Sequence, residues 1–256
     1  NWSNSTVFDM YRHDISSSNT STSGASSLYD SSFYFMTTDF NVYKVLDNNG
    51  GTAYSGVEPT STATAPFSLG GYLLQYMYTI TSSDAQKFVT TDFIPVQTDS
   101  TVSAAATDGA IDNIVITAGG SSYSSTPTVT ITGDGSGATA SATVAGNAVT
   151  GITITDNGSG YTFATVTISG GGGTGATAEA IISPKGGHGF DAVAELGGHF
   201  VMTATTLTAG ESDDFTTAND FRQIGLVVNP TNFGTATIAS ASTARQTFAV
   251  VFPSGT

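Results

Sequence analysis

The histidines of this chain are the residues best suited to acid–base or metal chemistry. There are three of them, His13, His188 and His199. His188 lies in the glycine-rich segment 184–190, which superficially suggests a loop that could cradle a phosphate. A true P-loop needs a glycine, four residues, and then Gly-Lys-Ser or Gly-Lys-Thr at the start of a helix. Here Lys185 precedes the glycines, so we do not expect phosphate binding.

A metal site is the second chemistry that these residues suggest. His188 and His199 are close in sequence to Asp191 and Glu195, and imidazole and carboxylate groups both bind metals. Their spacing matches no recognised ligand motif, so a hydrogen-bonded histidine in a turn is the favoured interpretation of His188. The sequence Gly-Asp-Gly-Ser-Gly at 133–137 invites comparison with calcium-binding repeats. Those repeats need an aspartate in every turn, and turn formation explains the glycines sufficiently.

Other patterns of catalytic residues are also weak. Asp213 and Asp214 are the adjacent acid pair, but glycosidases need two carboxylates that face each other across a bond. We find no nucleophile elbow, zinc-protease motif or dinucleotide fingerprint in the sequence. We therefore predict that the chain is not an enzyme, and we assign no catalytic residue, no cofactor and no metal ligand.

The charge balance narrows the possible partners. The 256 residues contain 20 acids and 6 bases, a net charge of −14, and charged residues make up only 10% of the chain. Nucleic-acid binding needs clustered basic residues, and anionic lipid attracts them too, so we expect neither nucleic acid nor membrane as a partner. Cysteine is absent, which excludes disulfides and thiolate chemistry.

The elements that must position these residues are predicted to be strands. Aromatic and β-branched residues fill 33–37, 42–46 and 72–80, and Asn48 to Gly51 could form a hairpin turn after the second of these. The best helical candidate is short, Asp191 to Leu196, and is stopped by two glycines. We predict an all-β fold with a multi-domain, β-sandwich-like architecture.

An internal repeat divides the chain. Ile-Val-Ile at 114–116 recurs as Ile-Thr-Ile at 152–154, and the Gly-Ser turn that ends in Tyr123 recurs at Tyr161, both 38 positions later. Alternation of small apolar and hydroxyl residues at 138–144 has the period of a half-buried strand. We predict that 106–184 is an inserted module of two β units in which both tyrosines are buried. Residues 1–105 and 185–256 would then form one discontinuous β core.

The C-terminal flank carries a family resemblance. The sequence Phe-Arg-Gln-Ile at 221–224, followed by Asn-Pro at 229–230, resembles a strand of the baseplate wedge subunit of T4-like contractile-tailed bacteriophages, the product of gene eight. The strands at 42–46, 72–80 and 246–252 fit the same order. The repeat resembles modules of cyanophage virion proteins. The motif residues, to which we assign a structural role, are Phe221, Arg222, Gln223, Ile224, Asn229 and Pro230.

The resemblance implies a non-enzymatic function. It implies a mainly β homodimer that binds neighbouring baseplate wedge proteins, is located in the virion tail and is assembled in the cytoplasm of the host bacterium. An alternative is a β-rich tail adhesin or carbohydrate-binding module, which an exposed platform of Tyr54, Tyr123 or Tyr161 would favour. A tail-associated glycan hydrolase or lyase would need a cleft with two facing acids.

Overall fold

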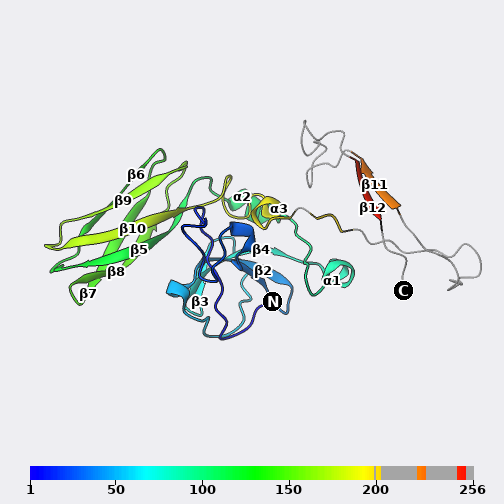
Figure 1. Cartoon of the computed structure of the whole chain (residues 1–256), viewed down its shortest axis with the longest axis horizontal. Helices are drawn as coiled ribbons and strands as arrows, with labels where there is room; N and C mark the ends of the chain where they lie inside the picture. Colours follow the sequence, from blue (N-terminus) through cyan, green and yellow to red (C-terminus); the bar gives the residue numbers. More distant parts are fainter. Residues whose placement is uncertain (199, 203–223, 229–246, 252–256) are drawn as a thin grey trace, which may run out of the picture. The chain divides into compact units, whose positions relative to one another are not determined.

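The structure is a computed structural model that describes residues 1–198, 200–202, 224–228 and 247–251 (Figure 1). The chain divides into two compact units, Asn1–Met202 and Thr203–Thr256. Strands predominate over helices, which confirms the predicted all-β class. In chain order the elements are the 3-10 helix η1 (Leu28–Asp30), β1 (Tyr34–Met36), β2 (Asn41–Asp47), η2 (Asn49–Gly51), β3 (Phe67–Leu69), β4 (Tyr72–Thr79), α1 (Ser82–Phe88), α2 (Ser100–Ala105), β5 (Ile111–Ser121), β6 (Thr128–Gly133), β7 (Thr139–Ala145), β8 (Ala148–Asp156), β9 (Ala164–Ser169), β10 (Thr174–Ile182), α3 (Ala192–Glu195), β11 (Ile224–Val228) and β12 (Thr247–Val251).

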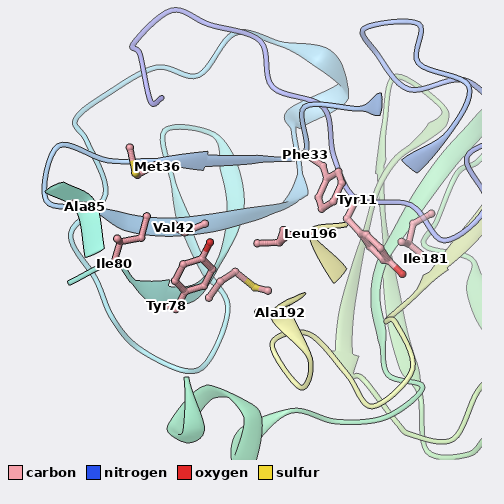
Figure 2. Close-up of a cluster of buried hydrophobic side chains, with 11 residues drawn as sticks. Tyr11, Phe33, Met36, Val42, Tyr78, Ile80, Ala85, Ile181, Ala192 and Leu196 are labelled. Atoms are coloured by element: carbon pink, nitrogen blue, oxygen red, sulfur yellow. The ribbon is translucent and has the colours of Figure 1, made fainter. Parts of the chain in front are cut away.

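The N-terminal part of the first unit is built on an antiparallel sheet with the order β1-β2-β4-β3. The central strands β2 and β4 are buried along almost their whole length, because apolar side chains cover both faces of the sheet. Val42 and Tyr78 enter one hydrophobic cluster, together with Leu196 from the C-terminal flank (Figure 2). Tyr43 and Tyr72 enter a second cluster. Neighbouring residues of β2 thus pack into different clusters, because successive side chains of a strand point to opposite faces of the sheet.

The prediction of a hairpin turn at 48–51 is wrong, because the strands on either side of it do not pair. β2 pairs with β1 and β4, whereas the next strand along the chain, β3, pairs with β4. The turn itself forms: Asn49, Gly50 and Gly51 have positive φ, and the Asn48 side chain accepts a hydrogen bond from the Gly51 N–H. The chain then runs through 52–66 before β3 begins, so the turn residues fix a local bend and not a strand pairing.

The repeat, residues 106–184, forms six strands that are coloured green in Figure 1. They make three antiparallel two-stranded ribbons: β5 with β10, β7 with β8, and β6 with β9. β5 also lies next to β8, β6 next to β7, and β9 next to β10, so each ribbon has the other two as neighbours. We call this part of the chain the repeat module.

The two copies of the repeat are interlocked and do not fold as separate units. The first strand of each copy pairs with the third strand of the other copy, and the two second strands pair with each other. Irregularities recur at equivalent places. The bulge between Thr177 and Ala178 matches the bulge between Thr139 and Ala140, and the bonded hydroxyls of Thr117 and Thr177 match Thr139 and Thr155, both 2.7 Å apart. The repeat module therefore has pseudo-twofold symmetry within one chain.

Tyr123 and Tyr161 occupy equivalent places in the core of the repeat module, and both are buried as predicted. Each ring lies against a glycine of the opposite copy. A Cβ added at Gly173 would lie 2.4 Å from Tyr123, and one added at Gly135 would lie 2.5 Å from Tyr161. These glycines are therefore required by the close approach of an aromatic ring, and they explain why both turns are glycine-rich.

The flanks contact the repeat module within the first unit. Asn113 on β5 donates a 2.7 Å hydrogen bond to Asp47 at the end of β2, and Arg12 forms a 2.7 Å ion pair with Glu179 on β10. The predicted helix is confirmed as α3, which packs into the cluster of Figure 2 through Ala192.

In the second unit, β11 and β12 pair antiparallel, in agreement with the apolar strands expected around 224–228 and 246–252. Ile224 of the family motif begins β11. The other motif residues, Phe221, Arg222, Gln223, Asn229 and Pro230, lie outside the described residues. The predicted discontinuous core of 1–105 and 185–256 stays a prediction, as does its β-sandwich-like arrangement.

Candidate functional site

Four ionisable side chains meet where the flanks join the repeat module. Nζ of Lys44 on β2 lies 2.8 Å from Oε2 of Glu195 on α3, and Nε2 of His188 lies 2.8 Å from Oδ2 of Asp112 on β5. The two pairs are adjacent, since His188 Nδ1 is 3.9 Å from Glu195 Oε2. We call these four residues the buried network. It connects three segments of the chain: the N-terminal sheet, the first strand of the repeat module and the segment that follows the module.

Lys44 is the most enclosed member of the buried network. Its side chain is 0% exposed, and its ammonium group lies 3.9 Å from the centre of the Tyr11 ring and 5.9 Å from that of Phe33. Burial lowers the pKa of Lys44, and the charge of Glu195 opposes that shift. The aromatic faces supply further attraction for the cation. Figure 2 shows the Tyr11 and Phe33 rings close together at the edge of the first hydrophobic cluster.

The Glu195 carboxylate is held from two sides. Oε2 accepts from Lys44, and Oε1 accepts a 2.7 Å hydrogen bond from the Gly189 N–H. Gly189 has φ of +81°, and an added Cβ would lie 2.3 Å from Val102, so the position requires glycine. The glycine-rich segment 184–190 thus places a backbone donor against a buried acid.

His188 has one satisfied ring nitrogen and one unsatisfied one. Nε2 bonds to Asp112, whereas Nδ1 is buried and has no hydrogen-bond partner among the described residues. Burial, with the nearby Lys44 charge, lowers the pKa of His188, while Asp112 and Glu195 oppose the shift. The ring is therefore held in a fixed orientation by Asp112 and favours its neutral form. The predicted hydrogen-bonded histidine is confirmed, with an additional buried acid beside it.

A cleft of about 550 Å³ lies beside one end of the buried network. His188 and Asp112 form part of its wall, together with Gln75 on β4 and with residues 105–107 and 155–158. A histidine–aspartate pair at a cleft can act as a general base, provided that a nucleophile lies within hydrogen-bond reach. Among the described residues, no serine or threonine hydroxyl bonds to His188. In the described part of the chain, the cleft thus has a histidine–aspartate pair with no hydroxyl group bonded to it.

The other candidates from sequence have structural roles. His13 Nδ1 accepts from the Ile182 N–H, and Asp191 caps α3 by accepting from the Ala194 N–H. His199, Asp213 and Asp214 lie outside the described residues. The described part of the chain contains no group of three or more residues arranged to hold a metal ion.

Asp134, the aspartate of the calcium-like sequence, fastens a loop of the opposite copy. Its carboxylate accepts from the Thr162 and Phe163 N–H groups and from the Thr162 hydroxyl, and these bonds lower its pKa to about 2. In the second copy the Gly171 carbonyl accepts the equivalent bonds from Ser124 and Ser125. The aspartate therefore substitutes for a backbone acceptor, which agrees with the turn interpretation.

Sequence reasoning missed Lys44 and Asp112. The available signal was a lysine inside the otherwise apolar stretch 42–46, at a position that alternation places on the same face as Val42. A lysine that faces a core requires a buried partner. Its partner Glu195 is 151 positions away, which no local pattern reveals.

Comparisons of the chain with protein-family models, curated proteins and solved structures found no match. In the described part of the chain, no helix has the length and apolar character needed to span a membrane.

Proposed function

We propose that this chain is a structural component of a contractile phage tail baseplate wedge, acts by binding neighbouring wedge proteins and forms a homodimer. The proposal places it in the virion tail. It begins from the sequence resemblance at Phe221 to Ile224 and at Asn229 and Pro230. The strand order along the flanks and the all-β fold are consistent with it, although many other proteins share that fold class.

The observation that carries the structural part of the proposal is the use of the chain's reactive groups as internal connections. Lys44, Glu195, His188 and Asp112 bind one another where the flanks join the repeat module. Asp134 and Asp191 bind backbone N–H groups of their own chain. Groups that satisfy one another inside the fold hold it together, whereas an active site directs such groups at a substrate.

The outer surface of the repeat module is suited to protein contacts. On the ribbon of β6 and β9, the exposed residues form the cross-strand pairs Thr128–Ser169, Thr130–Thr167 and Thr132–Thr165. Such a surface is polar but uncharged, so a partner can cover it without removing ions from water. We infer that this ribbon is available for contacts with other proteins of the tail.

The alternative of a carbohydrate-binding module has less support. Tyr54, Tyr123 and Tyr161, the tyrosines that could have formed a sugar-binding platform, are all buried. A hydrolase is supported still less, because the acids that line the cleft are Asp112, which bonds to His188, and Asp156, which accepts from the Gly158 N–H. We therefore retain the wedge component as the proposed function.

Mass photometry of the purified full chain tests this proposal. We expect a homodimer alone and, after mixing with the baseplate wedge proteins of the same virus, a discrete complex of fixed stoichiometry. The test variant is Arg222→Ala, which changes the family motif and should weaken the complex with the wedge proteins. A protein that does not bind the wedge proteins, or that forms a stable trimer, would contradict the proposal and favour the alternative of a tail adhesin.

A further inference from the structure

We propose that the buried network is a self-crosslinking site, in which Nζ of Lys44 and Cδ of Glu195 become joined by an amide bond in the folded protein. The bond would link β2 of the N-terminal sheet to α3. The proposal goes beyond the wedge function and does not depend on it. Four features of the buried network carry it: proximity, an apolar enclosure, a backbone donor, and an oriented acid–base group.

The first feature is the proximity of the two reacting groups. Lys44 Nζ lies 2.8 Å from Glu195 Oε2, and the side chains are only 0% and 4% exposed. Groups held together in one geometry react as if at very high concentration, because folding has already removed their freedom of motion. The exclusion of water also opposes hydrolysis of an amide once it has formed.

The second feature is the apolar enclosure of the amine. A lysine can act as a nucleophile only as a neutral amine, and a desolvated lysine loses its proton more easily. The rings of Tyr11 and Phe33 lie over Lys44. Transfer of one proton from Nζ to Oε2 along the existing hydrogen bond converts the ion pair to an amine and a carboxylic acid. That step removes both charges from the apolar interior, so burial favours it.

The third feature is the Gly189 N–H, which donates to Glu195 Oε1 at 2.7 Å. When Nζ attacks Cδ, negative charge develops on Oε1, and a backbone donor already in place stabilises it. Glycine is required at this position because a side chain would collide with Val102. The donor is therefore built into the fold before the reaction begins.

The fourth feature is His188, because a role in proton transfer would explain why its Nδ1 atom has no hydrogen-bond partner. Nδ1 has no hydrogen-bond partner in the described residues and lies 3.9 Å from Oε2, the oxygen that must leave. Asp112 holds the opposite nitrogen at 2.8 Å and so orients the ring. A neutral imidazole in this position can take a proton from the attacking nitrogen and return it to Oε2.

The reaction balances without any further reagent. The ammonium and carboxylate groups give one amide and one water: the Nζ–Cδ bond forms, the Cδ–Oε2 bond breaks, and two of the three Nζ protons leave on Oε2. No oxidation or reduction occurs. Each molecule reacts once, so the site modifies its own chain and does not turn over a substrate.

Intact-mass spectrometry of the folded full chain, followed by tryptic mapping, tests the proposal. We expect a mass lower than that of the sequence by one water. Trypsin should then fail to cleave after Lys44 and should release residues 13–87 joined to residues 186–222. A folded protein with the full mass, normal cleavage after Lys44 and no joined peptide after prolonged warming would overturn the proposal.

Matched variants make the test specific. Lys44→Arg should abolish the joined peptide, whereas Lys87→Arg, at an exposed lysine, should retain it. His188→Gln keeps both reacting groups and should slow the appearance of the joined peptide at least several-fold. If Lys44→Arg fails to fold, the joined peptide of the unmodified sequence decides alone. Asp108 and Asp134 are each followed by glycine, where an aspartate can lose water by closing a ring with its own backbone. A loss of water that maps to either of these residues, with no joined peptide, would overturn the proposal.

Discussion

At the scale of single residues, the four ionisable side chains of the buried network come from segments that are far apart in the sequence and meet inside the fold. Lys44 and Glu195 could not be paired from sequence, because alternation shows that Lys44 faces inward but not which residue it meets. His188 was correctly predicted to be hydrogen-bonded in a turn. Its partner Asp112 is 76 positions away and carries no local signal.

Protonation of the buried His188, and of His13, should destabilise the fold in mild acid. Burial lowers the pKa of His188 below its ordinary value of 6.5, and partial desolvation also lowers the pKa of His13. The unfolded state therefore binds protons at a pH where the folded state does not. Stability should be complete above pH 6.5 and should fall as the pH drops below it.

Urea unfolding of the full chain between pH 8 and pH 5 measures this effect. His188→Gln should remove part of the pH dependence and His13→Gln another part, so the double variant should have the shallowest profile. Lys44, Glu195, Asp112 and Tyr11 all surround His188 and remain present in these variants. A pH dependence unchanged in the double variant would show that neither histidine causes it.

Asp134 should also contribute stability that is lost as the pH falls, but at a lower pH than the histidines. Its folded pKa of about 2 lies below the ordinary value of 3.8, so its contribution is present above pH 3.8 and disappears as the pH falls through about 2. Asp134→Asn should lower the melting temperature at pH 6 and make little difference near pH 2. Asp92→Asn, at another exposed acid, is the control and should have no comparable effect at either pH.

At the scale of elements, the strands could be predicted but their pairing could not. Alternation at 138–144 identified the exposed threonines of β7 and its inward-facing Ala140 and Ala142, and the apolar stretches identified β2 and β4. Periodicity reveals which face of a strand is buried and says nothing of its neighbour. The interlocked copies and the failed hairpin at 48–51 both follow from that limit.

Because the two copies are equivalent, substitution of equivalent glycines should lower the free energy of unfolding by similar amounts. Gly135→Ala and Gly173→Ala should each push a methyl group into a buried tyrosine ring and destabilise the protein by roughly 1–3 kcal/mol, the usual cost of overpacking. Chemical unfolding followed by tyrosine fluorescence measures both. Gly151→Ala is the control, because its nearest neighbour would be 3.8 Å away. Markedly unequal losses for the two glycines would contradict the pseudo-twofold arrangement.

At the scale of the whole molecule, the flanks should fold without the repeat module. The N-terminal sheet has two hydrophobic clusters, of which the first also includes Ile181 of β10, while the repeat module has two others. Deleting residues 106–184 and closing the gap with a short Gly-Ser linker should leave a folded, dimeric protein. Circular dichroism and mass photometry would check this outcome. An unfolded or aggregated product would contradict the prediction that the module is an insertion.

Deleting a single copy should do more harm than deleting both. Without residues 147–184, β5 loses β10 and β7 loses β8, so apolar side chains of the remaining strands lose their cover. We expect protease to digest this variant rapidly within 106–146, whereas the same segment of the full chain should resist digestion. Equal resistance of the single-copy variant and the full chain would show that one copy folds alone.

We propose that the chain is a wedge protein of a phage tail, and its location in the virion tests this proposal most directly. Quantitative mass spectrometry of purified baseplates from the virus that encodes the chain would measure its copy number. We expect the chain in a fixed ratio to the other wedge proteins. Its absence from the baseplates, or its presence only in detached tail fibres, would contradict the claim.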